Sequence, residues 1–161
     1  MNNSPAIAFH PRNMADTERL GAALADHLPA GTTVALCGTL GAGKTRLVQS
    51  VALASNVAEG VVVSPTFVLA QHYAGNRVIH HFDTYRLRDC DEFLDLGPEE
   101  CFDSTGITFV EWADRVAEVL PLDHLRIEIE VLGETERQFL LTATGPKADA
   151  ALDLVRRTIA D

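Results

Sequence analysis

The 161-residue chain is short of basic residues, with 13 Lys and Arg against 23 Asp and Glu and a formal net charge of −10. A protein whose main task is to grip a phosphate backbone needs a surplus of Lys and Arg, so this deficit argues against direct, strong nucleic-acid binding. The acids are concentrated between residues 89 and 103, which hold seven Asp and Glu and no base. We interpret this stretch either as a solvated helical face or as a docking surface for a basic partner.

Cysteine is also scarce, and its three copies (Cys37, Cys90 and Cys101) follow neither a C-x-x-C pattern nor a Cys/His zinc spacing. An odd number of thiols with no short pairing favours a reduced, cytoplasmic setting. The adjacent His80 and His81 would point to opposite faces of a strand, which makes them strand residues rather than co-ligands of one metal. No apolar run reaches the roughly 20 residues of a membrane span, and no signal peptide is recognisable. We therefore expect a cytoplasmic protein without a membrane partner.

What the chain does contain is enough apolar sequence, 47%, to bury the core of a single domain over residues 1–161. Apolar runs typical of strands alternate with helical patterns, which indicates an α/β fold. We predict strands over residues 6–9, 33–37, 61–63, 67–73, 78–82, 107–110, 125–132 and 138–143. We predict helices over residues 16–28, 43–55 and 147–159, and one or two short acidic helices over residues 91–102, broken at Gly97-Pro98.

Residues 38–45 read GTLGAGKT and match G-x-x-x-x-G-K-[ST], the phosphate-binding P-loop. The glycines allow backbone conformations that a side chain would forbid, so that N–H groups converge on a phosphate at a helix N-terminus. Lys44 offers a charge to the phosphate oxygens, and Thr45 offers a hydroxyl ligand to Mg²⁺. The motif follows an apolar strand and opens a helix, the setting in which it works. The predicted nucleotide-binding residues are Gly38, Thr39, Leu40, Gly41, Ala42, Gly43, Lys44, Thr45 and Arg46.

A P-loop also needs a carboxylate near Mg²⁺, usually at the end of an apolar strand. Two candidate strands end in an acid, one in Asp83 and the other, more continuously apolar, in Glu111. Thr66 lies 21 residues after Thr45, where P-loop enzymes often place a second threonine that touches Mg²⁺ or the γ-phosphate. The alternative for Thr66 is an ordinary proline-containing loop, and the sequence leaves both interpretations open.

Three rival classes of P-loop protein deserve a test. A GTPase would show D-x-x-G after a strand and N-K-x-D later, but residues 103–106 (DSTG) precede their strand and residues 146–149 (PKAD) begin with proline. A small-molecule kinase needs an arginine-bearing lid, for which Arg86 and Arg88 are candidates, yet no lid-length insertion is visible. A nucleotide-sensing binding module with little turnover remains open, because composition does not separate it from an enzyme.

Four ordered motifs resemble those of the bacterial TsaE (YjeE) family: GTLGAGKT, SPTF at 64–67, HFDTYRL at 81–87, and Val110-Glu111-Trp112. Members are P-loop ATPases required for threonylcarbamoyladenosine (t6A) formation in tRNA. The resemblance implies a three-layer P-loop NTPase fold, with a central, mostly parallel sheet and antiparallel additions. It also implies ATP and ADP with Mg²⁺ as cofactors, TsaD- and TsaB-type partners, and contact with tRNA only through those partners.

The resemblance also implies a role for each matching residue. Lys44 would contact the phosphates, Thr45 and Glu111 would bind Mg²⁺, and Thr66 would be the switch threonine. Asp83 would orient or activate water, which makes Lys44, Asp83 and Thr66 the predicted catalytic residues, and Trp112 would lie beside the nucleotide.

The chain departs from the family pattern at three positions. Thr39 replaces the usual acid, Thr84 replaces a typical leucine and is interpreted as a packing change, and Ala113 replaces a common proline.

Overall fold

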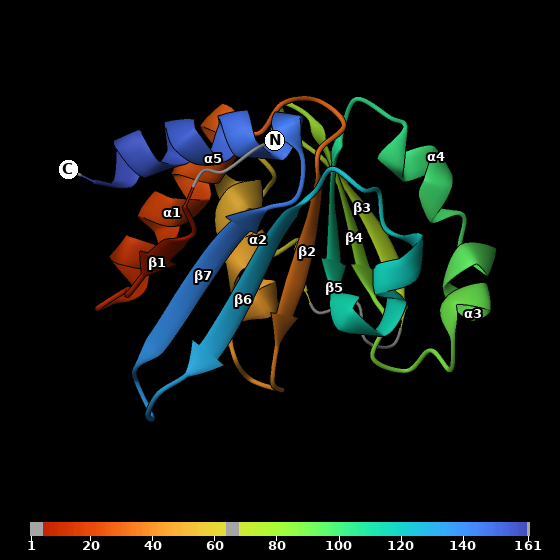
Figure 1. Cartoon of the computed structure of the whole chain (residues 1–161), viewed down its shortest axis with the longest axis horizontal. Helices are drawn as coiled ribbons and strands as arrows, with labels where there is room; N and C mark the ends of the chain where they lie inside the picture. Colours follow the sequence, from red (N-terminus) through yellow and green to blue (C-terminus); the bar gives the residue numbers. More distant parts are fainter. Residues whose placement is uncertain (1–4, 64–67, 161) are drawn as a thin grey trace.

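The computed structural model describes residues 5–63 and 68–160 (Figure 1). Its strands are β1 (Ile7–Phe9), β2 (Thr33–Gly38), β3 (Ala70–Ala74), β4 (Val78–Asp83), β5 (Ile107–Glu111), β6 (Leu125–Val131) and β7 (Arg137–Ala143). Its α-helices are α1 (Met14–His27), α2 (Lys44–Ala54), α3 (Cys90–Asp95), α4 (Pro98–Phe102) and α5 (Pro146–Ile159), and a 3₁₀ segment, η1, covers Ala113–Val119.

All seven strands form one sheet in the order β1-β7-β6-β2-β5-β4-β3. The four central strands β6, β2, β5 and β4 are parallel, and β3, β7 and β1 are added antiparallel. This is the α/β architecture that the sequence predicts. The first five residues of β2, TVALC, are all buried, as expected of a strand covered on both faces of a parallel sheet.

Two separate apolar layers hold the sheet. One joins α1, α2 and α5 to side chains such as Leu36, Phe109 and Leu141, and the other joins α3, α4 and η1 to Phe82 and Val110. Figure 1 shows the three long helices gathered toward the left of the sheet and α3 and α4 at the right. Side chains that alternate along each strand therefore enter two different environments.

Three segments differ from the predicted elements. Residues 61–63, three valines, do not form a strand: Val61 and Val63 are exposed, while Val62 packs into the core and its carbonyl accepts a hydrogen bond from Gln49. A β-branched run gains strand geometry only when a neighbouring strand pairs with it. The strand predicted over 67–73 is β3, at Ala70–Ala74, and its predicted start lies outside the described residues. The η1 segment was not predicted.

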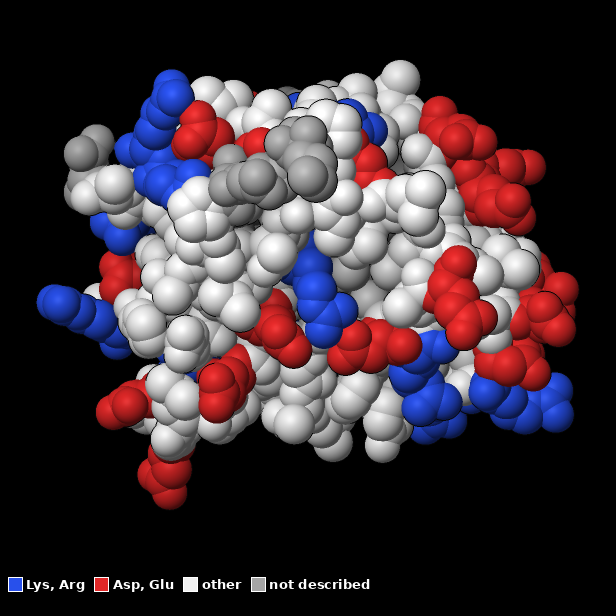
Figure 2. All heavy atoms as spheres, viewed as in Figure 1, with Lys and Arg blue, Asp and Glu red and all other residues white. Residues whose placement is uncertain are grey.

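The acidic stretch 89–103 forms α3, α4 and their flanks, and most of its acids are exposed. Figure 2 shows these acids gathered on the right of the molecule, over α3 and α4. Two of them also have local structural contacts, because Asp89 caps α3 by accepting from the Glu92 N–H and Glu92 pairs with Arg88. Within residues 5–63 and 68–160, no helix is long and apolar enough to cross a membrane.

Candidate nucleotide-binding site

The glycine-rich loop joins the end of β2 to the start of α2. Gly41 and Gly43 have φ values of +78° and +113°, where L side chains are strained, and Gly43 is the N-cap of α2. A Cβ on Gly38 would lie 2.7 Å from the carbonyl oxygen of Ile129 on β6, so only glycine fits there. The α2 N-terminus has no side-chain cap and no acid in its first turn. Its first N–H groups and the helix dipole therefore suit an anion.

Lys44 folds back over this loop. Its side chain is 5% exposed, and Nζ donates to the carbonyl oxygens of Gly38 at 2.8 Å and Thr39 at 2.9 Å. Nζ also lies 3.9 Å from the ring centroid of Trp112, a cation–π contact. Burial lowers the pKa of Lys44, while Glu111 and Asp83 act in the opposite direction. Two neutral carbonyl oxygens therefore hold the Lys44 ammonium group in place, and the carboxylates of Glu111 and Asp83 lie nearby.

Thr45 and Glu111, the two predicted Mg²⁺ ligands, are in direct contact. The Thr45 hydroxyl donates to Oε2 of Glu111 at 2.8 Å, although the two residues are 66 positions apart. Parallel pairing of β2 with β5 places Glu111 beside Leu36 at the end of β2, next to the loop. The carboxylate is 3% exposed. The structure thus brings a hydroxyl and a carboxylate, the oxygen ligands that Mg²⁺ prefers, to one point.

A buried histidine supports this carboxylate from the other side. Nε2 of His81, which is fully buried, lies 2.5 Å from Oε2 of Glu111 and donates to it. Nδ1 of His81 lies 3.3 Å from the Tyr73 hydroxyl on β3. Such a relay fixes the position of a ligating carboxylate. The sequence analysis missed His81 and Tyr73 as parts of the site; the HFD motif carried the signal, because its histidine is two residues before Asp83 on the same strand face.

Asp83 lies opposite Glu111 in the β4–β5 register and is 1% exposed. Its Oδ1 accepts a hydrogen bond from the backbone N–H of Tyr85 at 2.8 Å, which holds the carboxylate at the strand end. Asp83 and Glu111 are therefore neighbours, and both remain candidates for the carboxylate near Mg²⁺.

Thr84 corrects one prediction. Its buried hydroxyl lies 2.8 Å from the Trp112 carbonyl oxygen and 3.1 Å from the Glu111 carbonyl oxygen, both hydrogen-bond acceptors. The residue therefore ties β4 to the end of β5, and it is more than a packing change.

Trp112 stands at the turn that follows β5. Its backbone is left-handed, with φ 59° and ψ 39°, a conformation that costs free energy in a non-glycine residue. The indole packs on Tyr85 with ring centroids 4.8 Å apart. Thr84, which binds the Trp112 carbonyl, is positioned to hold this turn. The indole contacts Lys44, and the predicted place of Trp112 beside the nucleotide stays a prediction.

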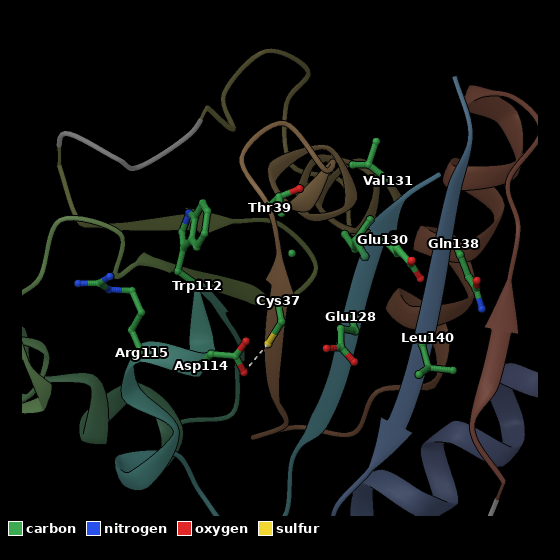
Figure 3. Close-up of a pocket in the computed structure, with 12 residues that line it drawn as sticks. Cys37, Thr39, Trp112, Asp114, Arg115, Glu128, Glu130, Val131, Gln138 and Leu140 are labelled. Carbon is green, nitrogen blue, oxygen red and sulfur yellow. Dashed lines mark hydrogen bonds between the residues drawn. The ribbon is translucent and has the colours of Figure 1, made fainter. Parts of the chain in front are cut away.

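Three hollows surround the loop. A cavity of about 360 Å³ is lined by residues 40–46 with Gln49, Asp83, Glu111 and Trp112. A second, of about 290 Å³, lies between the loop and residues that include Arg46, Arg137 and Phe139. A third, of about 580 Å³, runs from Thr39 and Trp112 across the open face of β6 and β7 (Figure 3).

In that third groove, Cys37 donates to Asp114 at 3.4 Å, and burial raises the pKa of its thiol to about 12. The thiol is therefore protonated and unreactive at neutral pH.

Most of the predicted site residues meet in the first of these cavities. It gathers Leu40, Gly41, Ala42, Gly43, Lys44, Thr45, Arg46, Asp83, Glu111 and Trp112. Gly38 and Thr39 adjoin it through the Lys44 hydrogen bonds. Thr66 lies outside the described residues, so its predicted role stays a prediction.

The mostly parallel sheet lies between two helical layers, and a glycine-rich loop joins β2 to α2. These two features define the P-loop NTPase fold class. Within that class, a family model described as "Threonylcarbamoyl adenosine biosynthesis protein TsaE" matches residues 11–139. The chain therefore belongs to the TsaE family, proteins of tRNA threonylcarbamoyladenosine biosynthesis, which confirms the resemblance seen in the four motifs.

Individual relatives agree with this family. The tRNA threonylcarbamoyladenosine biosynthesis protein TsaE of Treponema pallidum is 39% identical over 127 residues, which cover 79% of this chain and 93% of that protein. The protein of the same name from Bacillus subtilis is 34% identical over 146 residues, 90% of each chain. Among solved structures, Bacillus subtilis YdiB superposes with a TM-score of 0.83 at 27% identity and 98% coverage of both chains.

Proposed function

We propose that this protein binds ATP and ADP with Mg²⁺ and hydrolyses ATP slowly, in support of t6A modification by TsaD- and TsaB-type partners. The observation that carries the proposal is the contact between Thr45 and Glu111 at the N-terminus of α2, directly beside the buried Lys44. A phosphate-binding loop with a charge and a pair of oxygen ligands is what a nucleotide–Mg²⁺ complex requires.

Phosphate binding would use Lys44 in a second position. Its Nζ now donates to two neutral carbonyl oxygens, and charged phosphate oxygens are stronger acceptors for an ammonium group. The uncapped N–H groups of α2 would bind the same phosphates. Thr45 and Glu111 would hold Mg²⁺, which neutralises charge on the phosphates when it is bound.

Hydrolysis needs an attacking water and stabilisation of the charge that develops on the transferred phosphoryl group. Asp83, buried next to Glu111, is the acid positioned to orient the water. Among the described residues that line this cavity, Arg46 is the one arginine, and its Nη1 is directed to the Met14 sulfur at 3.3 Å. We therefore expect slow hydrolysis by the isolated chain, because an arginine finger accounts for much of the rate in related chemistry.

The base and ribose would occupy the 290 Å³ cavity on the other side of the loop. There Arg46 and Arg137 supply two cations, while Pro11 and Phe139 supply apolar surface. Arg137 is fixed against the loop, since its Nε donates to the Ala42 carbonyl at 3.2 Å.

A thermal-shift titration tests nucleotide binding. ATP and ADP with Mg²⁺ should raise the melting temperature, and GTP should do so less; equal stabilisation by GTP, or none by any nucleotide, would count against the proposal. A turnover assay then separates a slow ATPase from a sensing module that does not turn over. Of the two arginines that a kinase lid could use, the exposed Arg88 pairs with Glu92 on α3.

Reconstitution tests the role in t6A formation. The chain, mixed with TsaD- and TsaB-type proteins, tRNA and ATP, should sustain multiple rounds of modification; omission of the chain should limit the reaction. Failure with a partner pair that is active with another TsaE protein would contradict the proposal.

Charge reversal of the exposed Asp91 and Asp95 should weaken complex formation and its salt dependence if the acidic stretch is a docking surface, and should change neither if that stretch is a solvated face.

A further inference from the structure

Three potential metal ligands meet on the face of β4 that carries Phe82, opposite the face that carries His81. Nitrogen atoms of His72 on β3 and His80 on β4 and the sulfur of Cys101 on α4 all lie within 4.8 Å of one another. The two histidines are direct cross-strand partners in the β3–β4 register. No sequence spacing indicated this cluster, because its members come from a hairpin and from a helix 21 residues further along the chain.

The hydrogen bonds of Ser104 determine which nitrogen of His80 is free. The single hydroxyl hydrogen of Ser104 is donated to the Cys101 carbonyl oxygen at 2.7 Å. Nε2 of His80, 3.1 Å from the same hydroxyl oxygen, must therefore be the donor in that contact. The ring consequently presents the lone pair of Nδ1 toward His72, whose Nδ1 lies 2.8 Å away.

The turn after α4 fixes the ring of His80 in this orientation. A Cβ on Gly106 would lie 3.0 Å from Nε2 of His80 and 2.5 Å from the Val78 carbonyl oxygen, so glycine is required for the ring to fit. The Gly106 N–H also donates to the Ser104 hydroxyl oxygen. The DSTG segment at 103–106 thus forms the kind of outer support that ligating histidines have in metal sites.

We propose that His72, His80 and Cys101 form a binding site for Zn²⁺ that ties the β3–β4 hairpin to α4. Two imidazoles and a thiolate are ligands of borderline-soft metals, and zinc accepts this set with water in the fourth position. In a tetrahedral site the two nitrogens would lie about 3.4 Å apart, so they must separate by roughly 0.6 Å from their present contact. The exposed His72 has room to move. When the metal binds, the Cys101 thiol proton leaves to solvent. His72 now donates from Nδ1 to His80, so it must take its other neutral tautomer, with the proton on Nε2, before Nδ1 can bind the metal.

This site is distinct from the proposed Mg²⁺ site in both position and chemistry. His80 lies on the face of β4 that carries Phe82 and faces α3 and α4, whereas His81 and Glu111 lie on the opposite face. The donor atoms here are nitrogen and sulfur, and those at Thr45 and Glu111 are oxygen. Zn²⁺ binding can therefore be tested separately from nucleotide binding, and the result for one does not decide the other.

Cobalt spectroscopy on the purified, nucleotide-free protein tests the assignment. Co²⁺ should bind with one ion per chain, give visible bands of a tetrahedral ion and a near-ultraviolet thiolate charge-transfer band, and be displaced by Zn²⁺. The variant C101S should lose the charge-transfer band, and H72A should weaken Zn²⁺ affinity by at least about 100-fold. H72A alters an exposed side chain on an edge strand, so it should remain folded.

Matched variants complete the test. C90S removes a thiol near the cluster in sequence but outside it, and H10A removes an exposed histidine; both should bind Zn²⁺ as the unmodified protein does. S104A keeps all three ligands and removes the support of His80, so it should weaken Zn²⁺ binding about tenfold. A cobalt complex without a thiolate band, or Zn²⁺ binding that survives H72A and C101S but is lost in E111Q, would overturn the proposal.

Discussion

Adjacent residues of β4 point to opposite faces of the sheet, and the groups that they contact on the two faces differ in chemistry. His81 and Asp83 point to the α2 side, where they meet Glu111 and the nucleotide-binding loop; both are at most 1% exposed. His80 points to the α4 side, where it meets another histidine, a serine and a cysteine. A single strand, through its two-residue alternation, thus contributes to an oxygen-rich site on one face and to a nitrogen–sulfur cluster on the other.

The largest expected effect comes from removal of the charge on the oxygen-rich side. Lys44→Ala should reduce ATP hydrolysis by at least about 100-fold, because an ammonium group next to the phosphates is lost. Steady-state phosphate release measures this. The matched control is Lys147→Ala, which removes the other lysine of the chain, an exposed side chain that binds the Gly31 carbonyl. Equal losses in both variants would contradict the assignment of Lys44.

The next largest effects are expected from substitution of the two buried carboxylates on that face, Glu111 and Asp83. Glu111→Gln should raise the Mg²⁺ concentration needed for half-maximal hydrolysis by about tenfold or more, because a direct ligand loses its charge. Asp83→Asn should lower kcat with a smaller change in Mg²⁺ dependence, since Asp83 is proposed to orient water. Mg²⁺ titrations at saturating ATP separate the two. If both variants show the same profile, the division of roles between the neighbours is wrong.

The comparison between the two faces is tested most directly by its adjacent histidines. His81→Asn should weaken Mg²⁺–nucleotide binding by about tenfold, because Glu111 loses its supporting donor, and should leave Zn²⁺ binding in place. His80→Asn should abolish Zn²⁺ binding and leave Mg²⁺–nucleotide affinity unchanged. Calorimetric titration of each variant with each metal gives four values. Loss of both metals in either variant would mean that the two faces are not independent.

The smallest effect concerns buried threonine hydroxyls. Thr84→Val should destabilise the fold by about 1 kcal/mol, because it removes the hydroxyl's hydrogen bonds to the Glu111 and Trp112 carbonyl oxygens, although each carbonyl keeps a backbone N–H donor. The Thr108 hydroxyl on β5 is buried without a partner among the described residues, so Thr108→Val should be neutral or stabilising by up to about 1 kcal/mol. Urea unfolding of both variants measures the difference. A loss of stability at Thr108 as large as that at Thr84 would indicate a partner for that hydroxyl.

Much of the fold and of the loop could be predicted from the sequence because the signals are local. Continuous apolar runs predict β2 and β5, and glycine positions predict the left-handed turns at Gly41 and Gly43. The valine run at 61–63 misled the same reasoning, since strand formation there depends on a partner strand. The η1 segment escaped prediction, and it begins where Trp112 turns the chain through a left-handed conformation.

The sequence by itself determined the glycine-rich loop, the family, and the two acids proposed as metal-site residues, since each depends on residues close together in the chain. Only the tertiary structure decided that Glu111 contacts Thr45, that His81 supports Glu111, and that His72, His80 and Cys101 form a cluster. The physical reason is strand register. Pairing between β2, β5, β4 and β3 brings together side chains separated by many residues, and no local pattern encodes which of them become neighbours.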